Sequence, residues 1–564
     1  SLSDDKRALF SKDTYLVRNM VNQFTQPNGT RPVPYGEILN HTRGTTNSHS
    51  GRVQLNFNRA WNNRHRLTAI AGAEVRQVHA VSDRYRLYGY DSETLTMQPV
   101  DMVSFFTMNP SRVGRIPDFA SAGDLIDRYV SEYANASYSY DSRYVVTASG
   151  RRDASNLFGV KTNQKSVPLW SVGGGWTISN ERFFRADWLP YLKLRMSYGY
   201  NGNINKSATA FSTASYYTDG LTGQPAARIL TPPDPQLRWE KVAIYNAGID
   251  FELKNRRLGG SLEFYKKKGT DQIGTIPLDP TTGFFLADRY STTRNGAAIR
   301  GSGFDAELTS RNTTGALKWQ TTFLFSYTKD EVISYQFEHP IISYLISGSP
   351  IEGRPVNSLY AYRWAGLDPQ TGDPMAYIEG TARKDYASMF SAQTIEDVAW
   401  MGTILPPFFG ALRNAFSWKA LSASVNINYK FGHVFRRNSI GYSSLYTAWK
   451  GHEDFRLRWQ KPGDEKVTNV PSMPQGLISN RDHFYLFSEA LVEKADHIRL
   501  QDLSLRYTPN LPENRFPFKD LSLMLSMENV GILWRANKAG IDPDYSLASM
   551  LPVRTISLGF KTTL

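Results

Sequence analysis

Aromatic and basic side chains between the expected strands are the residues best suited to bind a ligand. Flat rings stack on sugar faces or peptide side chains at low entropic cost, and arginine orients carboxylates. The candidates for contact with a substrate are Tyr216, Tyr217, Phe284, Phe285, Arg436, Arg437, Tyr442, Tyr446 and Trp449. Packing of loops on themselves, or contact with another protein, would explain the same pattern equally well.

Residue patterns that support catalysis are missing from the sequence. No GxxxxGK[ST], HExxH or GxSxG motif occurs, so phosphate-binding loops, zinc proteases and hydrolases are not expected. Cysteine is absent and the nine histidines are dispersed. The stretch 541–545, Ile-Asp-Pro-Asp-Tyr, offers oxygen ligands for calcium, although a solvated turn is the commoner structure. We therefore expect no enzyme, no metal site and no cofactor.

The elements that position these residues are strands with one apolar and one polar face. Residues 421–431 alternate over eleven positions, which is long enough to cross a bilayer when tilted. No apolar run approaches the roughly 18 residues of a membrane-spanning helix. Similar alternation recurs at 53–61, 67–75, 133–141, 144–152, 192–200, 244–254, 258–266, 304–310, 317–327, 498–507, 521–528 and 554–564. The pattern predicts an all-β, antiparallel β-barrel that crosses a membrane.

Connections between these segments are of two kinds. Tight polar turns are expected at Asn62-Asn63, Asp141-Ser142 and Asn255-Arg256. Long connections run over 79–128, 202–239, 269–296, 333–404 and 433–495. Short turns at one end and long loops at the other are typical of bacterial outer-membrane barrels, whose long loops are extracellular. About 16 to 18 strands are expected.

The net charge of +13 raises the question of a nucleic-acid partner. Lysine and arginine are scattered over strand ends and loops instead of forming one tract, which argues against nucleic acid. Anionic outer-membrane lipid is the expected counterpart.

Nine sequence landmarks, in a consistent order, give the chain a family resemblance. Most of them are turn-forming by composition, with Asp, Gly and Pro at short spacing. They are 152–159 (RDASNLFG), 192–199 (LKLRMSYG), 234–241 (DPQLRWEK), 353–355 (GRP) with 360–363 (YAYR), 366–374 (GLDPQTGDP), 459–464 (WQKPGD), 497–502 (HIRLQD), 528–530 (ENV), and Pro552 with Arg554-Thr555. The chain resembles the SusC/RagA-like TonB-linked outer-membrane transporters of Bacteroidetes.

This resemblance implies a barrel of 22 strands, of which residues 1–564 would be the C-terminal majority. The family's N-terminal extension domain, TonB box and plug are not found in the sequence. The closing strand 554–564 is therefore expected to pair with a strand upstream of Ser1.

The resemblance also implies a function. It is active import of oligosaccharides or oligopeptides, with a SusD-like surface lipoprotein as a lid and with energy from TonB-ExbB-ExbD. It also allows a dimer of such pairs. Two alternatives are a passive porin or structural outer-membrane barrel without a plug, and a barrel with enzymatic loops.

Overall fold

The computed structural model describes most of the chain. The described residues are 1–110, 112–156, 166–203, 209–218, 224–277, 281, 291–336, 341–378, 380–387, 395, 398–509, 520–546 and 551–563.

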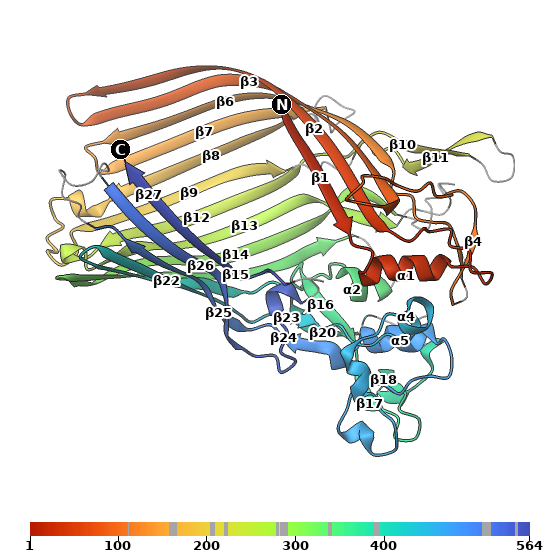
Figure 1. Cartoon of the computed structure of the whole chain (residues 1–564). Coiled ribbons are helices and arrows are strands. Elements are labelled where there is room, and N and C mark those ends of the chain that lie inside the picture. The colour runs from red at the N-terminus through yellow and green to blue at the C-terminus, as the bar shows by residue number, and fades with distance from the viewer. Residues whose placement is uncertain are drawn as a thin grey trace.

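Sixteen antiparallel strands form one strongly curved sheet (Figure 1). In sheet order they are β1 (Leu2–Phe10), β2 (Glu37–Trp61), β3 (His65–Tyr90), β6 (Ser121–Tyr140), β7 (Tyr144–Ser155), β8 (Ser166–Thr177), β9 (Tyr191–Asn203), β12 (Glu240–Glu252), β13 (Leu258–Pro277), β14 (Ser291–Thr314), β15 (Leu317–Tyr335), β21 (Phe408–Trp418), β22 (Leu421–Phe431), β25 (His497–Tyr507), β26 (Asp520–Arg535) and β27 (Thr555–Thr563). Within the described residues, β1 and β27 each pair on one side only. The expectation that the last strand pairs with one upstream of Ser1 stays a prediction, as does the total of 22.

Several strands are longer than the alternation predicted. β2 begins at Glu37 instead of residue 53, and β3 continues to Tyr90 instead of residue 75. Period-two patterning reports only the part of a strand that lies against lipid, because beyond the bilayer both faces meet water. The charged strand β1, the strand β8 and the strand β21 have no counterpart among the predicted segments. In β21, Gly410 and Asn414 interrupt the apolar face.

Smaller elements gather at the end of the sheet that carries the long connections, at the right of Figure 1. Short turns join the strands at the other end. The helices are α1 (Tyr15–Phe24), α2 (Ile341–Ser347), α4 (Tyr442–Ala448) and α5 (Ser479–Leu486). The small strands are β4 (Phe106–Met108), β5 (Arg112–Gly114), β10 (Thr213–Thr218), β11 (Pro225–Thr231), β16 (Ser358–Tyr362), β17 (Trp364–Leu367), β18 (Pro374–Ile378), β19 (Thr381–Arg383), β20 (Val398–Thr403), β23 (Val434–Arg436) and β24 (Val492–Lys494). Among the described residues, no helix has the length and apolar character needed to span a bilayer.

Exposed aromatic side chains mark the short-turn rim of the sheet. They are Trp61, Tyr140, Tyr144, Trp176, Tyr191, Trp319, Trp418 and Tyr507. On β21, the exposed rings of Trp418 and Phe408 stand at opposite ends of the strand. Ten residue steps give about 33 Å along the strand, or about 25 Å of height at a tilt of about 40°. This matches the apolar band of an outer-membrane barrel between two aromatic girdles.

Three glycines lie directly opposite tyrosines on neighbouring strands: Gly72 opposite Tyr133, Gly303 opposite Tyr265 and Gly410 opposite Tyr429. At Gly410, a Cβ atom would collide with the Leu324 carbonyl oxygen and the Tyr429 hydroxyl. That hydroxyl donates a hydrogen bond to the same Leu324 oxygen at 2.8 Å. The ring of Tyr429 therefore crosses the place that a side chain at 410 would fill.

Replacing Gly410 with alanine should destabilise the barrel. We expect Gly410→Ala to lower the free energy of unfolding by about 1–3 kcal/mol, because the Tyr429 ring and its hydrogen bond must shift. Heat-dependent gel mobility in detergent measures the transition. Gly150→Ala is the matched control, since a Cβ there would meet nothing within 4 Å. Equal stability of the two variants would contradict the packing described here.

Candidate functional site

The two longest connections, residues 336–407 and 432–496, pack on each other at the long-loop end. One buried apolar cluster combines Leu345, Tyr360, Tyr362, Ala376 and Val398 from the first with Phe484 from the second. Another, within the second, combines Ile440, Tyr442, Val470, Tyr485 and Leu491, and Trp364 of the first packs against it. The loops therefore have an apolar core of their own.

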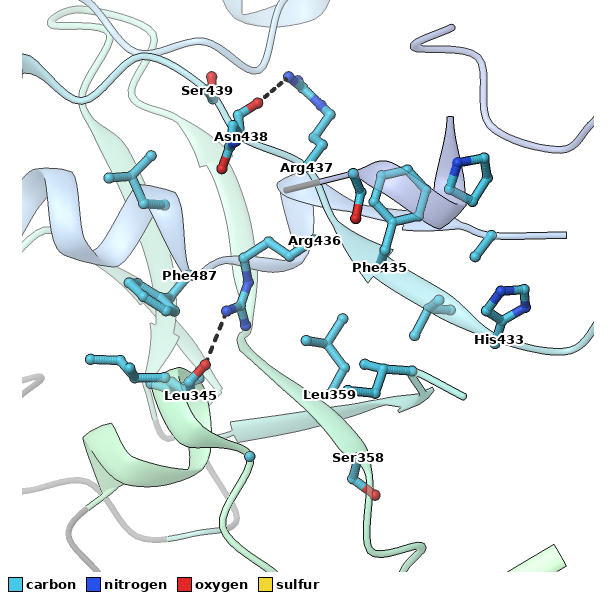
Figure 2. Close-up of a pocket in the computed structure, with 18 of the residues that line it drawn as sticks. Leu345, Ser358, Leu359, His433, Phe435, Arg436, Arg437, Asn438, Ser439 and Phe487 are labelled. Carbon is cyan, nitrogen blue, oxygen red and sulfur yellow. Dashed lines mark hydrogen bonds between the residues drawn. The ribbon is translucent and has the colours of Figure 1, made fainter. Parts of the chain in front are cut away.

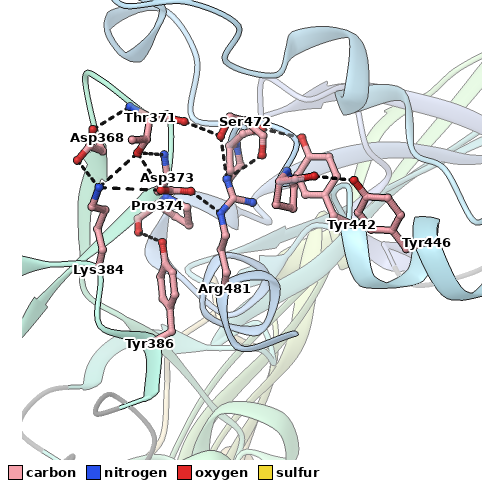
Figure 3. Close-up of polar contacts among 12 residues, drawn as sticks. Asp368, Thr371, Asp373, Pro374, Lys384, Tyr386, Tyr442, Tyr446, Ser472 and Arg481 are labelled. Carbon is pink, nitrogen blue, oxygen red and sulfur yellow. Dashed lines mark hydrogen bonds and ion pairs between the residues drawn. The ribbon is translucent and has the colours of Figure 1, made fainter. Parts of the chain in front are cut away.

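Arg481 on α5 links the two loops through a buried ion pair (Figure 3). Its side chain is only 1% exposed. Its Nε donates to Asp373 Oδ1 at 2.7 Å, and Nη2 donates to the Ser472 carbonyl oxygen at 2.7 Å. The guanidinium also lies over the ring of Tyr442, 5.7 Å from its centre. The hydrogen bonds of Nε and Nη2 offset part of the cost of burying this charge, while Nη1 has no hydrogen-bond partner among the described residues.

The turn at 366–374 presents Asp373 to Arg481. Asp368 Oδ1 accepts hydrogen bonds from the backbone N–H groups of Gln370 and Thr371 at 2.8 and 2.9 Å. Lys384 lies 2.7 Å from the other oxygen of Asp368. The hydrogen bond from Lys384 lowers the pKa of Asp368 to about 2, although burial opposes this shift. The carboxylate therefore stays ionised at any physiological pH.

Gly372 shows why this turn and the 459–464 landmark belong together. Its φ of +68° is left-handed, and the Trp459 ring occupies the place where a Cβ would be. The carbonyl oxygen of Gly372 accepts a hydrogen bond from Ser472 N at 2.9 Å. Two landmarks about 90 residues apart in sequence thus form one junction between the loops.

A cavity of about 970 Å³ lies where the two loops meet the ends of β22 and the 536–554 connection. Its wall mixes apolar side chains such as Leu345, Phe435 and Phe487 with the basic side chains shown in Figure 2. Asp544 is the single carboxylate among the lining residues, against Lys430, Arg436, Arg437 and Lys450. Volume and mixed polarity are those of a small-ligand site.

Arg436 and Arg437 line this cavity as predicted, but their guanidinium groups hold the loops together. Arg436 donates to the carbonyl oxygens of Leu345 (3.0 Å) and Tyr360 (2.5 Å) and stacks on Phe487. Burial lowers the pKa of Arg436 to about 10. Arg437 pairs with Asp454 at 2.5 Å. Both arginines shape the wall of the cavity and leave few donors for a ligand.

A network of charged groups closes the other side of the cavity. Asp544 pairs with Lys430 at 2.7 Å and lies 3.2 Å from His497 Nε2. Burial opposes ionisation of Asp544, but hydrogen bonds from His497 and Lys430 outweigh it and hold its pKa far below the ordinary value. Asp542 pairs with Arg499 at 2.5 Å.

The turn expected at 541–545 is present at Pro543–Tyr545, but its carboxylates form ion pairs instead of being fully hydrated. The side chains of Asp542 and Asp544 are only 14% and 21% exposed, because Arg499 and Lys430 at strand ends form ion pairs with their oxygens. In the part of the chain that the structure describes, no cluster of three His, Asp or Glu residues is arranged to hold a metal ion.

The remaining candidates differ in exposure. Tyr442 is 1% exposed and its hydroxyl donates to the Pro471 oxygen at 2.6 Å, while that of Tyr446 donates to the Pro474 oxygen at 2.5 Å. Tyr442 and Tyr446 therefore pack within the loops, which was the alternative explanation for the aromatic pattern. Trp449 is 57% exposed, and Tyr216 on the β10–β11 hairpin is 83% exposed.

Three candidates cannot be placed: Phe284, Phe285 and the Tyr217 side chain lie outside the described residues. Substrate contact stays a prediction for all nine. Four further residues line the cavity and were not predicted as site residues: Lys430, His433, Lys450 and Asp544. Two stretches singled out in the sequence lie close to them, because 541–545 contains Asp544 and 497–502 contains His497, which contacts Asp544.

Fold and site together define an outer-membrane β-barrel with a loop-built cavity at one end. A sequence model of the family described as TonB dependent receptor-like, beta-barrel, matches residues 4–530. The chain belongs to this family.

Relatives and solved structures agree with this assignment. TonB-dependent receptor P39 of Formosa agariphila is 25% identical over 582 residues, covering 93% of this chain and 52% of that protein. TonB-dependent receptor SusC of Bacteroides thetaiotaomicron is 23% identical over 262 residues, covering 42% of this chain and 25% of that protein.

A structure of the RagAB peptide importer in its "open-open" state superposes with a TM-score of 0.70 at 22% identity, covering 94% of this chain and 56% of that one. At this identity, the likeness establishes the fold. The chain spans about half the length of P39 and of the RagAB chain. The predicted SusC/RagA-like resemblance, all-β barrel and outer-membrane location are confirmed.

The cavity wall should open more readily in acid. Burial, together with the charge of His497, lowers the pKa of His433 to about 4, from an ordinary value of 6.5. An opened loop therefore binds a proton that the closed loop does not, and closed-state stability falls as the pH drops from 6.5 towards 4. Opening should increase by up to about tenfold per pH unit in this window. Hydrogen exchange of residues 432–496 measures it.

His433→Asn should flatten this pH dependence, whereas His49→Asn, on an exposed part of β2, should leave it unchanged. A wild-type pH profile retained by His433→Asn would show that another group is responsible.

Proposed function

We propose that the protein containing this chain imports oligosaccharides or oligopeptides across the outer membrane with energy from TonB. Membership of the TonB dependent receptor-like family supports this proposal. The observation that carries it is the fixed set of loops at one end of the sheet, which enclose a ligand-sized cavity. A mouth held by buried ion pairs suits selective capture more than free diffusion.

A lid protein and an energy source complete the mechanism. A SusD-like lipoprotein would cover the long loops, and a plug pulled by TonB-ExbB-ExbD would open the path. Two of the RagAB structures are described as those of a peptide importer, which supports the oligopeptide alternative for this chain. Exposed Trp449 and Tyr216 are suited to stack on sugars or peptide side chains. Two such pairs could assemble as a dimer, and no catalytic step is assigned to the chain.

A passive porin is the competing function, since a barrel without a plug needs no energy. The two differ in what limits uptake. A porin conducts down a gradient, whereas a TonB-driven importer stops when the proton gradient is lost.

Uptake in cells carrying the intact gene distinguishes the two. We expect accumulation of labelled oligosaccharides or oligopeptides to cease after tonB deletion or addition of a protonophore, at an unchanged level of the protein. A SusD-like lipoprotein should be recovered with the protein in mild detergent, and mass spectrometry of the co-purified ligand should identify the substrate class. Uptake that persists without TonB would reject the import proposal in favour of a porin.

A further inference from the structure

A group of lysines stands on the outer face of the sheet, close to its long-loop rim. Lys266 and Lys268 lie on β13, and Lys329 lies on β15. All three are exposed. In the described part of the chain, none of them has a carboxylate partner within ion-pair distance.

Strand register shows that these lysines share one face. One row across six strands reads Val172, Tyr198, Tyr245, Lys266, Ser302 and Lys329. The next row towards the loops reads Trp170, Tyr200, Ala243, Lys268, Arg300 and Glu331. The lysines therefore sit beside a cluster of aromatic rings, in which Trp170, Tyr198 and Tyr200 contact one another.

This face is the one that meets lipid. The row just below the lysines, towards the short turns, reads Ala247, Phe264, Phe304 and Tyr327. The opposite face of the same strands carries the ion pairs of Arg195 with Asp250 and Glu263. In an outer-membrane barrel the apolar face is outward and the polar face is inward. Towards the long loops, the outer face therefore changes from apolar side chains to aromatic rings and lysines.

The lysines surround a hollow of about 630 Å³, lined also by Tyr198, Tyr245 and Arg300. Arg300 is matched by Glu331, with both Glu331 oxygens 2.9 Å from its Nη2. Asp330, its neighbour, accepts a hydrogen bond from Val356 N instead. Lys267 and Asp330 also line the hollow and their charges offset each other, so a net charge of three remains there. Strands about 4.8 Å apart place Lys266 and Lys329 on either side of the Ser302 hydroxyl.

We propose that this hollow binds the phosphate groups of an anionic glycolipid of the outer leaflet. Lysine side chains at this height are long enough to bring their amines to the headgroup layer while their methylene stems cover apolar surface. Lys266 Nζ lies over the Phe264 ring, 5.7 Å from its centre, and rotates upwards to meet a phosphate. Aromatic rings at the same level anchor the interface. Phosphate oxygens accept several ammonium hydrogen bonds at once, and Ser302 adds a donor. Because the hollow is on the outer face, it is separate from the import path.

Lipid binding to the purified full-length protein tests the proposal. Native mass spectrometry in mild detergent would count bound diphosphoryl lipid A as it is titrated. The variant Lys266→Gln/Lys268→Gln/Lys329→Gln should bind at least about tenfold more weakly. The control Lys254→Gln/Lys318→Gln/Lys419→Gln removes the same charge from exposed lysines at the short-turn rim and should bind as wild type.

Two further arms make the outcome decisive. Glu331→Gln frees Arg300 and should strengthen binding, a gain that a folding defect cannot produce. Dephosphorylated lipid A should bind weakly to the wild type. Equal binding by the two triple variants, equal binding of both lipids, or displacement of lipid A by millimolar inorganic phosphate would overturn the proposal. The last result would indicate a site for free phosphate.

Discussion

The loop assembly depends on the buried ion pair between Arg481 and Asp373. Inside the sheet, strand pairing satisfies the backbone, but the two longest connections leave the sheet and must hold their shape independently. Arg481 is hydrogen-bonded to Asp373, which lies 108 positions earlier in the sequence, and its guanidinium faces the ring of Tyr442. Because a guanidinium without partners is costly to bury, it selects the one arrangement in which Asp373 and Ser472 both reach it. Both apolar clusters of the loops form around that arrangement.

Several sequence landmarks are anchors of the same kind. Leu237 and Trp239 of the 234–241 stretch are buried, and Arg238 reaches Asp271 of β13 at 2.5 Å. Near the end of β15, Gly353 N donates to the Val332 carbonyl oxygen and Val332 N donates to the Arg354 carbonyl oxygen, both at 2.9 Å. Asn529 accepts from Arg499 at 3.1 Å and donates to the Pro552 oxygen at 2.8 Å, which ties three landmarks together. Each anchor fixes a loop to a strand end.

The sequence was informative where lipid imposes a pattern and uninformative where loops pack on themselves. Strand 421–431 was predicted to the residue, since one of its faces meets lipid along its whole length. The upper parts of β2 and β3 were missed, because water on both faces removes the alternation. Tyr442 and Trp449 are aromatic residues of the same loop with similar surroundings in the sequence, yet Tyr442 is buried and Trp449 is exposed. Val470, Phe455 and α5 bury Tyr442, and no local sequence pattern encodes these contacts.

The central claim is that Arg481 and Asp373 together fix the mouth of the barrel. Hydrogen exchange of the full-length protein, comparing Arg481→Met with Lys461→Met on the exposed surface of the same loop, tests it most directly. We expect Arg481→Met to lower protection across residues 364–386 and 442–486 by about 2–4 kcal/mol, with the strands unchanged, because it removes the donors to Asp373 Oδ1 and the Ser472 oxygen and leaves Asp373 only Thr371 and the more distant Lys384. Asp373→Asn added to Arg481→Met should restore part of the loss. Protection in Arg481→Met equal to that in Lys461→Met would contradict the claim and show that the apolar clusters alone hold the loops.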